Sequence, residues 1–289
     1  MDSEFVDSLL RPGSARFSGK YLPKESKRGI IRTPMKIMRI ACVIPARLKS
    51  SRFPKKMLAM LAGRPLLQWV WEAALATERF DQVVIAVDDE EIADVVKSFG
   101  GTFTMTSPAC LSGTERLVEL VQTNRIKADI YVNWQGDEPF VEGKIIEDLL
   151  QSIDKGDGEI WTLKKRIEDP LQITSTQYAK VVTDIQGYAL LFSRSPIPCY
   201  RDDKENEEKI YYKHFGIYAF THNALQKISL LSPCAIEMAE QLEQLRFLHH
   251  GLKIKVHETQ FEVQGIDLPE HLAMAEQLVK LRHPSVVVM

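Results

Sequence analysis

The chain has 289 residues, of which 45% are hydrophobic and 26% charged, and these values are typical of an ordinary globular protein. The formal net charge of −2 argues against a general nucleic-acid binder, which would be strongly basic. The sequence holds no apolar run close to the roughly 20 residues that a membrane-spanning helix needs, so we expect no membrane insertion. We expect reduced thiols and a cytoplasmic protein, because no paired zinc or disulfide motif joins the scattered cysteines Cys42, Cys110, Cys199 and Cys234.

Residues 1–36 differ in composition from the rest of the chain. They combine turn-forming residues with scattered basic side chains and lack the apolar core of a secretory signal. We expect a disordered leader, with Met35 or Met38 as a possible natural start, and a weakly basic targeting segment as the less favoured alternative. Residues 37–289 show no internal repeat and no clean linker, so we expect a single domain there.

Strand-like and helix-like stretches alternate from residue 40 to residue 153. Short apolar runs rich in β-branched residues predict strands at 40–44, 83–87, 102–105 and 130–132. Helical spacing of apolar residues predicts helices at 66–75, 92–99, 114–122 and 145–153. This alternation predicts an α/β fold whose mainly parallel sheet is covered on both faces.

The pattern changes near residue 160. Apolar stretches and a turn at 184–187 predict strands at 161–165, 179–183, 188–193 and 216–220. We therefore expect an inserted antiparallel lobe at about 160–220, in which the charged segment 204–209 forms a mobile loop. The remaining pattern predicts a helix at 236–249, a strand at 253–258 and a helix at 269–281.

The loop that follows the first predicted strand is rich in cations. Within a few residues it places Arg47, Lys49, Arg52, Lys55 and Lys56. In open parallel sheets, ligands bind outside the carboxyl ends of the strands, and Arg and Lys side chains suit phosphate oxygens. The loop lacks the glycine spacing of a P-loop, so side chains should carry the binding. Basic loops are often only solvated surface, but this position and density favour a phosphate site.

Two carboxylates follow predicted strands and precede predicted helices. Asp137 lies in Gln135-Gly136-Asp137-Glu138-Pro139, and Asp267 lies in Gly265-Ile266-Asp267. Magnesium prefers a few carboxylates together with water and phosphate oxygens, so the pair suits a metal held against a triphosphate. The alternative is that each Asp caps the helix that follows it.

Other polar residues could recognise the organic parts of a substrate. Ser112 and Gly113 open a predicted helix and could bind a nucleobase edge as well as cap the helix. Substrate contacts or ordinary structural and surface roles are both open for the remaining candidates, which are Arg194, Arg201, His214, Glu240 and Gln244.

Several motifs, matching in order from residue 40 to residue 281, resemble the 3-deoxy-manno-octulosonate (Kdo) cytidylyltransferase family, also called CMP-Kdo synthetases. The motifs are the basic segment 44–58, Ser112-Gly113-Thr114-Glu115-Arg116, Gln135-Gly136-Asp137-Glu138-Pro139, the segments 192–198, 214–218 and 242–246, and Gly265-Ile266-Asp267.

The resemblance implies a Rossmann-like nucleotidyltransferase fold, a homodimer and dependence on Mg²⁺. It implies that CTP and Kdo react to give CMP-Kdo and pyrophosphate for lipopolysaccharide core synthesis. By this resemblance the triphosphate is held by Arg47 and Lys56, with Asp137 completing the catalytic set. Ala46, Ser112 and Gly113 would lie near the cytidine, Asp137 and Asp267 would bind Mg²⁺, and the sugar acid would contact Gln135, Arg194, Arg201, His214, Glu240 and Gln244.

The chain departs from the family pattern at three places. Lys55 stands where a glycine is usual, so the loop should be stiffer or should hold phosphate more strongly. Ala109 and Cys110 stand where the family often has Asp-His, and only the second half of 176–182 matches. A cytidylyltransferase for another sugar acid, such as an amino-Kdo or a sialic acid, is the nearest rival function. A non-catalytic nucleotide-sugar binding protein is the rival of another class.

Overall fold

A computed structural model describes residues 38–50, 52–202, 208–263 and 265–282 of the chain. The expected leader at 1–36 and most of the expected mobile loop at 204–209 lie outside these ranges. The described residues from Met38 onward fall into one compact unit. Within the described ranges, no helix is long and apolar enough to cross a membrane.

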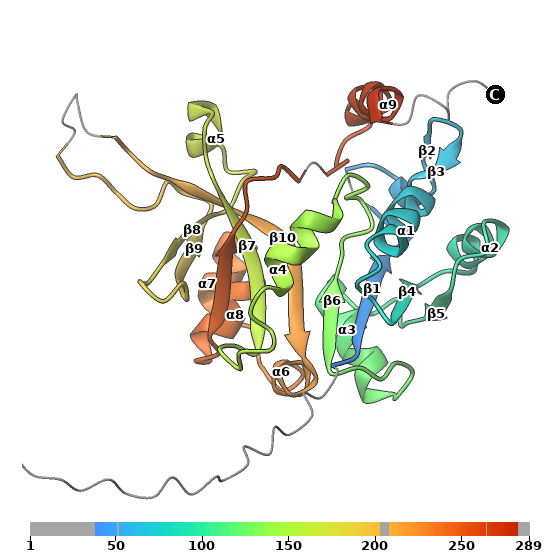
Figure 1. Ribbon diagram of the computed structural model, residues 1–289, viewed down its shortest axis with the longest axis horizontal. Coiled ribbons are helices and arrows are strands. Elements are labelled where there is room, and N and C mark those ends of the chain that lie inside the picture. The colour runs from blue at the N-terminus through green and yellow to red at the C-terminus, as the bar shows by residue number, and fades with distance from the viewer. Residues whose placement is uncertain (1–37, 51, 203–207, 264, 283–289) are drawn as a thin grey trace, which may run out of the picture. The chain divides into compact units, whose positions relative to one another are not determined.

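Nine strands form one sheet in the described part of the chain (Figure 1). Seven of them lie side by side in the order β11 (Ile254–Glu258), β7 (Ile160–Arg166), β10 (Tyr212–Thr221), β6 (Ile130–Asn133), β1 (Ile40–Ala46), β4 (Gln82–Val87) and β5 (Phe103–Met105). The pairs β6–β1, β1–β4, β4–β5 and β11–β7 are parallel, whereas β10 runs antiparallel to both of its neighbours. The prediction of a mainly parallel sheet is confirmed.

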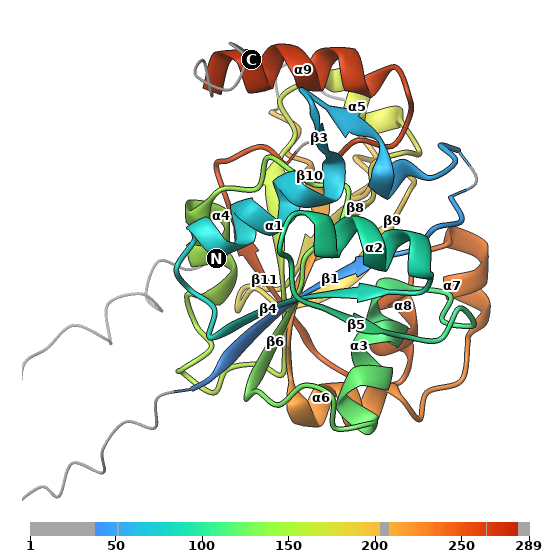
Figure 2. The same ribbon diagram turned by 90° about the vertical axis from the view of Figure 1, so that its right-hand side faces the viewer.

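Both faces of the sheet are covered, as its alternating side chains require. Cys42 and Ile44 of β1 pack toward one layer, and Ala41 and Val43 pack toward the other. The first layer contains α1 (Leu66–Ala76), α2 (Glu90–Ser98) and α4 (Gly143–Leu150). The second contains α3 (Gly113–Gln122), α6 (His222–Ile228) and α8 (Gln244–His249), and Figure 2 shows the two layers on opposite sides of the strands.

The expected antiparallel strands extend the main sheet. β8 (Lys180–Thr183) and β9 (Ala189–Ser193) form a hairpin, and β8 pairs with β10 at a single position, Lys213 opposite Lys180. The turn between them is held by Asp184, whose Oδ1 accepts hydrogen bonds from the backbone N–H groups of Gln186 and Tyr188. Because β10 belongs to the main sheet, this pairing makes the hairpin continuous with the sheet.

The single helix predicted at 236–249 is wrong. The chain forms two short helices, α7 (Ala235–Glu240) and α8, separated by Gln241 in the left-handed conformation with φ 52°. The guanidinium of Arg194 donates to the carbonyls of Glu240 and Gln241, and these long-range bonds stabilise the corner. Helical spacing continues through the corner, so the sequence pattern alone does not reveal it.

Five further elements were not predicted from the sequence: α5 (Pro170–Thr174), the helix α6, the paired strands β2 (Met60–Leu61) and β3 (Arg64–Pro65), and the 3-10 turn Lys56–Leu58. The last helix, α9 (His271–Arg282), packs with Ala275 and Val279 against Leu61, Trp69 and Phe140. This packing fixes the segment that carries Asp267 close to the basic loop.

Candidate active site

A pocket of about 180 Å³ opens at the carboxyl ends of β1 and β6. Four segments distant in the sequence form it: the basic loop, the start of α3, the turn after β6 and the segment before α9. The pocket lining contains seven of the predicted site residues, namely Arg47, Lys56, Ser112, Gly113, Gln135, Asp137 and Asp267. Ala46 lies at the buried end of β1, between the lining residues Pro45 and Arg47.

Lys56 lies at the centre of the charged groups in this pocket. It begins the short 3-10 turn Lys56–Leu58 and is only 7% exposed. Its ammonium forms a hydrogen-bonded ion pair with Asp137 Oδ2 and lies 3.0 Å from Asp267 Oδ1. Arg52 Nη2 also lies 2.9 Å from Asp267 Oδ1. Burial acts to raise the pKa of Asp267, but the cations Lys56 and then Arg52 outweigh it and hold that pKa below its usual value.

The carboxylates Asp137 and Asp267 suit a magnesium ion. Both converge on one point, which the Lys56 ammonium contacts, and both are oxygen donors of the kind that Mg²⁺ prefers. Among the described residues there is no group of three or more metal-ligating side chains, so water and phosphate oxygens would have to complete the shell. The donor set therefore fits a metal that binds together with a polyphosphate.

Glu138, beside this pair, behaves differently. Burial, reinforced by Asp137 and Asp267, raises the pKa of its carboxyl well above the usual value. Its Oε2 is buried and has no hydrogen-bond partner among the described residues. Burial therefore favours the neutral form of Glu138, and the Lys56 ammonium acts against this.

Lys55 does not strengthen the phosphate site as its charge suggests. Its backbone adopts the left-handed conformation with φ 55°, which favours the glycine usual in the family. Its ammonium lies 2.7 Å from Glu91 Oε1 at the start of α2, and Lys55 is not part of the pocket lining. The expectation that Lys55 holds phosphate more strongly is therefore not supported. Its left-handed backbone does make Lys55 a strained residue in the loop.

A second ion pair holds the basic loop in place and was missed in the sequence. The backbone N–H of Leu48 donates to Asp88 Oδ1 at 2.9 Å, and Asp88 Oδ2 lies 2.8 Å from Nη2 of the buried Arg116 in α3. Arg116 also donates to Thr106 Oγ1 at 2.7 Å. Asp88 follows β4 directly, just as carboxylates follow β6, and this shared position was the available signal.

Two glycines let the walls of the pocket approach each other. A Cβ at Gly113 would lie 2.9 Å from Pro45 Cγ, and a Cβ at Gly136 would lie 2.8 Å from the Pro45 carbonyl oxygen. Both distances are shorter than the contacts that Cβ atoms make with neighbouring atoms in proteins. A larger residue at either position would push the basic loop away from α3 or from the turn after β6.

Ser112 caps α3, as the alternative interpretation predicted. Its Oγ accepts the backbone N–H of Glu115 at 3.1 Å and donates to Glu243 Oε1 at 2.6 Å. Cys110 lines the pocket nearby, and its thiol donates to Glu119 Oε2 at 3.2 Å. Burial, followed by the hydrogen bond to Glu119, raises the pKa of that thiol to about 11, so it stays protonated at neutral pH. All four cysteines are free.

Three predicted sugar-binding residues lie on or against β10, and of these only Gln135 lines the pocket. Gln135 lines the pocket and donates to the carbonyl of Gly216 in β10 at 3.1 Å. His214, also in β10, lies 3.1 Å from Thr162 Oγ1 through Nε2 and 3.5 Å from Gln244 Nε2 through Nδ1. Burial lowers the pKa of His214 to about 3, so its ring is neutral at working pH. These three side chains offer neutral hydrogen-bonding atoms.

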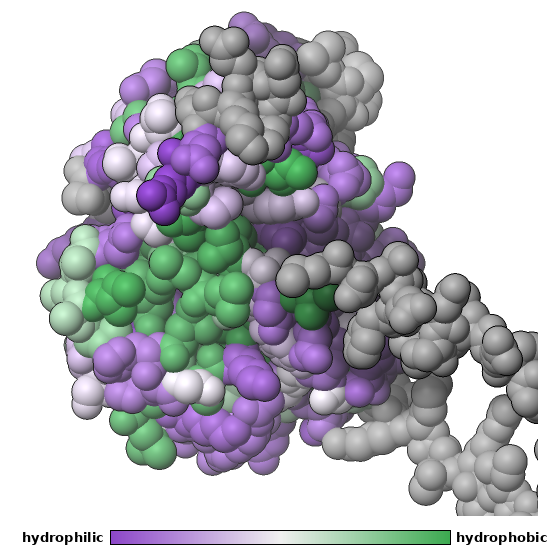
Figure 3. All heavy atoms as spheres, turned by 90° about the vertical axis from the view of Figure 1, so that its left-hand side faces the viewer, coloured by the Kyte–Doolittle hydropathy of each residue, from purple (hydrophilic) through white to green (hydrophobic). Residues whose placement is uncertain are grey.

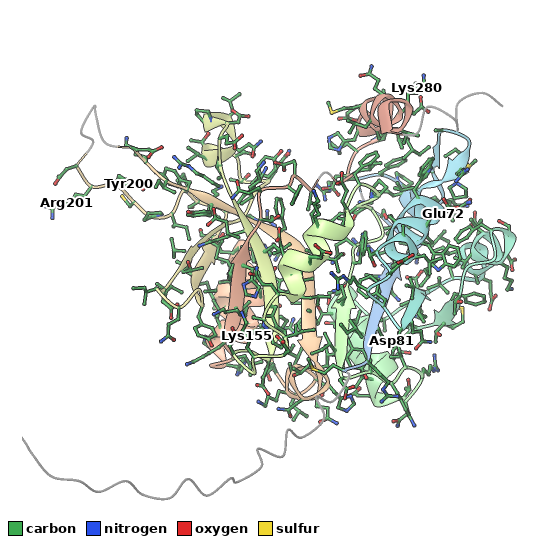
Figure 4. All side chains as sticks on the ribbon, in the orientation of Figure 1. Glu72, Asp81, Lys155, Tyr200, Arg201 and Lys280 are labelled. Atoms are coloured by element: carbon green, nitrogen blue, oxygen red, sulfur yellow. The ribbon has the colours of Figure 1, made fainter. Side chains whose placement is uncertain are left out.

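The other three predicted sugar-binding residues are engaged elsewhere. Glu240 accepts hydrogen bonds from Ser193 Oγ at 2.6 Å and from the Arg194 backbone at 2.9 Å. The Arg194 guanidinium donates to backbone carbonyls, including that of Thr176 at 2.8 Å. Arg201 is exposed and does not line the pocket, and Figure 4 shows it at the outer end of the connection between β9 and β10. The structure does not bring these three side chains into the pocket.

Comparison with known proteins agrees with this geometry. The sequence model of a family described as cytidylyltransferase matches residues 41–254. A 3-deoxy-manno-octulosonate cytidylyltransferase from Geobacter sulfurreducens is 42% identical over 253 residues, which cover 84% of this chain and 100% of the relative. One from Thermodesulfovibrio yellowstonii is 42% identical over 245 residues, covering 82% and 96%.

Two solved structures are also similar. The structure of a CMP:2-keto-3-deoxy-manno-octonic acid synthetase complexed with CTP gives a TM-score of 0.79 at 38% identity, covering 84% of this chain and 99% of that one. A 4-diphosphocytidyl-2C-methyl-D-erythritol synthase from Anaerococcus prevotii gives a TM-score of 0.55 at 11% identity and supports the fold alone. The chain therefore belongs to the 3-deoxy-manno-octulosonate cytidylyltransferase family.

Proposed function

We propose that this protein transfers the cytidylyl group of CTP to Kdo, giving CMP-Kdo and pyrophosphate for lipopolysaccharide core synthesis in the cytoplasm. The observation that carries the proposal is the convergence of Lys56, Asp137 and Asp267 beneath a cationic loop, in a chain of this family. A polyphosphate requires cations around it, and a metal held against it requires carboxylates, and this pocket offers both.

The reaction is an in-line displacement at the α-phosphorus of CTP. The anomeric hydroxyl oxygen of Kdo forms the new O–P bond while the bond to the pyrophosphate oxygen breaks, and the hydroxyl proton passes to a base. Arg47 and Lys56 stabilise the negative charge that moves onto the phosphate oxygens. Mg²⁺, when bound by Asp137 and Asp267, supplies further charge neutralisation there.

The neutral group of Gln135, His214 and Gln244 is proposed to contact the sugar acid. Amide and imidazole atoms can donate to and accept from hydroxyl groups without titrating near neutral pH. The sequence-based assignment of Arg194 and Glu240 is revised to a supporting role, since both hold the corner between α7 and α8. Arg201 is not part of the sugar-acid site that we propose within one chain.

The proposal predicts selectivity among sugar acids. Pyrophosphate release should be measured with CTP, Mg²⁺ and, in turn, Kdo, an amino-Kdo and a sialic acid. We expect the highest kcat/KM for Kdo. A higher value for another sugar acid would replace Kdo as the substrate, whereas CTP binding without release in any mixture would support the non-catalytic alternative.

We also propose that two copies associate through the face formed by the β8–β9 hairpin and α7. Figure 3 shows a broad apolar area on this side of the molecule. Leu190 on β9 is 63% exposed, and Met238 on α7 is 61% exposed, which is unusual for a monomer's surface when such residues gather. Leu190→Glu should give a monomer in analytical ultracentrifugation, whereas Leu230→Glu, at an exposed position just after α6, should leave the dimer intact.

A further inference from the structure

We propose that Glu243 is a positioning residue that joins the nucleotide side of the active site to its sugar side. The inference rests on the proposed function and adds a residue to which the resemblance gives no role. Glu243 lies at the corner between α7 and α8, directly before Gln244. Its side chain reaches across to the start of α3, which is 129 residues away in the sequence.

Each carboxylate oxygen of Glu243 holds one hydroxyl of the α3 start. Oε1 accepts from Ser112 Oγ at 2.6 Å, and Oε2 accepts from Thr114 Oγ1 at 2.6 Å. Burial raises the pKa of Glu243, and the hydrogen bonds from Ser112 and Thr114 act in the opposite direction by favouring its ionised form. Gly113 lies between the two hydroxyls and contacts Pro45 below the basic loop, so the clamp fixes the wall of the pocket.

The clamp also determines how Ser112 can meet a nucleotide. A serine hydroxyl has one proton to donate and two lone pairs to accept with. Ser112 gives its proton to Glu243 and accepts the backbone N–H of Glu115, so one lone pair remains. Ser112 can therefore accept a hydrogen bond from a ligand donor but cannot donate to a ligand while Glu243 is ionised.

On the other side, the corner that carries Glu243 is rigid. Arg246 of α8 makes two hydrogen bonds to Glu237 of α7, at 2.8 Å from Nε and 2.5 Å from Nη2. Arg194 holds the carbonyls at the end of α7. A fixed corner that grips α3 sets the distance between Ser112 and Gln244, and through Gln244 the position of His214.

The test uses Glu243→Gln, which keeps the side-chain shape but removes the charge and one acceptor. Pyrophosphate release gives KM for CTP and for Kdo, calorimetry gives the affinity for CTP, and thermal unfolding gives Tm. We expect KM for both substrates to rise about tenfold, which corresponds to the loss of one charged hydrogen bond. The value of kcat should change by less than about threefold, because no reacting atom is touched.

Two further variants separate positioning from stability. Thr114→Val removes one bond of the clamp at nearly constant volume, and its effect together with Glu243→Gln should be less than additive. Glu237→Gln breaks the ion pair of the same corner and should lower Tm while leaving both KM values unchanged. Glu243→Gln behaving like Glu237→Gln, or raising only one KM, would overturn the proposal.

Failure of the proposed function gives a different result. Wild-type protein that releases no pyrophosphate with CTP and Kdo would refute the function, while calorimetry with CTP alone would still test the clamp on the same variants. A weaker CTP affinity in Glu243→Gln and in Thr114→Val, with the double variant less than additive, would then support the clamp. An unchanged CTP affinity would refute it.

Discussion

Replacing Lys56 by methionine tests the charged centre of the site. Met keeps much of the buried aliphatic stem but removes the ammonium that contacts both Asp137 and Asp267. The adjacent Lys55 provides a matched control, because Lys55→Met removes an equal charge whose partner, Glu91, lies on the surface of α2. The two variants therefore separate the position of the charge from its amount.

The expected loss of stability follows from the distances. One ammonium contacts both carboxylates, so their contacting oxygens lie at most about 5 Å apart, and at an effective dielectric constant of about 20 their repulsion is at least about 3 kcal/mol. The Asp267 side chain is 41% exposed, which screens part of this, and we expect a loss of about 1–2 kcal/mol. In a domain of this size that lowers Tm by roughly 2–8 °C.

Catalysis should suffer more than stability. Loss of a preorganised charge at a developing negative charge typically costs about 10²–10³ in rate, so kcat/KM of Lys56→Met should fall by that factor. Lys55→Met should stay within about threefold of wild type, since exposed ion pairs contribute little. Mg²⁺ should raise the Tm of Lys56→Met by more than that of wild type, because the uncompensated carboxylates then bind the metal without competition.

The assays are steady-state pyrophosphate release and thermal unfolding with and without Mg²⁺. The pKa of Asp267 is held low by Lys56, so the stability that the pair contributes is present above about pH 4 and is lost as pH falls through the lowered pKa. The Tm difference between wild type and Lys56→Met should shrink accordingly in acid. Equal losses of activity in the Lys55 and Lys56 variants, or no extra effect of Mg²⁺, would refute this reasoning.

Three further predictions concern single side chains. Asp137→Asn should abolish turnover with Tm changed by only a few degrees, and a variant that keeps most of its kcat would refute the metal role. Burial lowers the pKa of His214 to about 3, so the free energy of unfolding falls as pH drops below the unfolded-state pKa of about 6.5. Between pH 6.5 and 5, urea unfolding of His214→Asn should show a loss of unfolding free energy about 1–2 kcal/mol smaller than that of wild type. An equal loss in the two proteins would contradict the burial of a neutral His214. Asp88→Asn should raise KM for CTP about tenfold by leaving the buried Arg116 without its carboxylate. Asp89→Ala, which removes only the cap of α2, should lower Tm alone.

Much of the fold could be predicted because its signals are local. The strands β1, β4 and β6 are buried on both faces and therefore appear as short apolar runs. The rule that ligands bind at the carboxyl ends of parallel strands then placed the basic loop and Asp137 at one edge. The pocket lining brings these predicted residues together with Asp267.

The remaining features depend on contacts between distant segments. The corner at Gln241 is stabilised by Arg194, which lies 47 residues earlier. Glu240 and Arg194 were expected to face a substrate, but each is the other's partner, and residue types alone do not distinguish these roles. The conformation of Lys55 could be suspected only because the family usually has glycine there.

The most direct test of the central claim is a phosphorus NMR spectrum of wild-type protein incubated with CTP, Kdo and Mg²⁺. The account predicts one new phosphodiester signal and one equivalent of pyrophosphate, with neither signal when Kdo or the metal is omitted. CTP that remains unchanged with a folded protein, or that breaks down to CDP and phosphate, would contradict the proposed cytidylyl transfer.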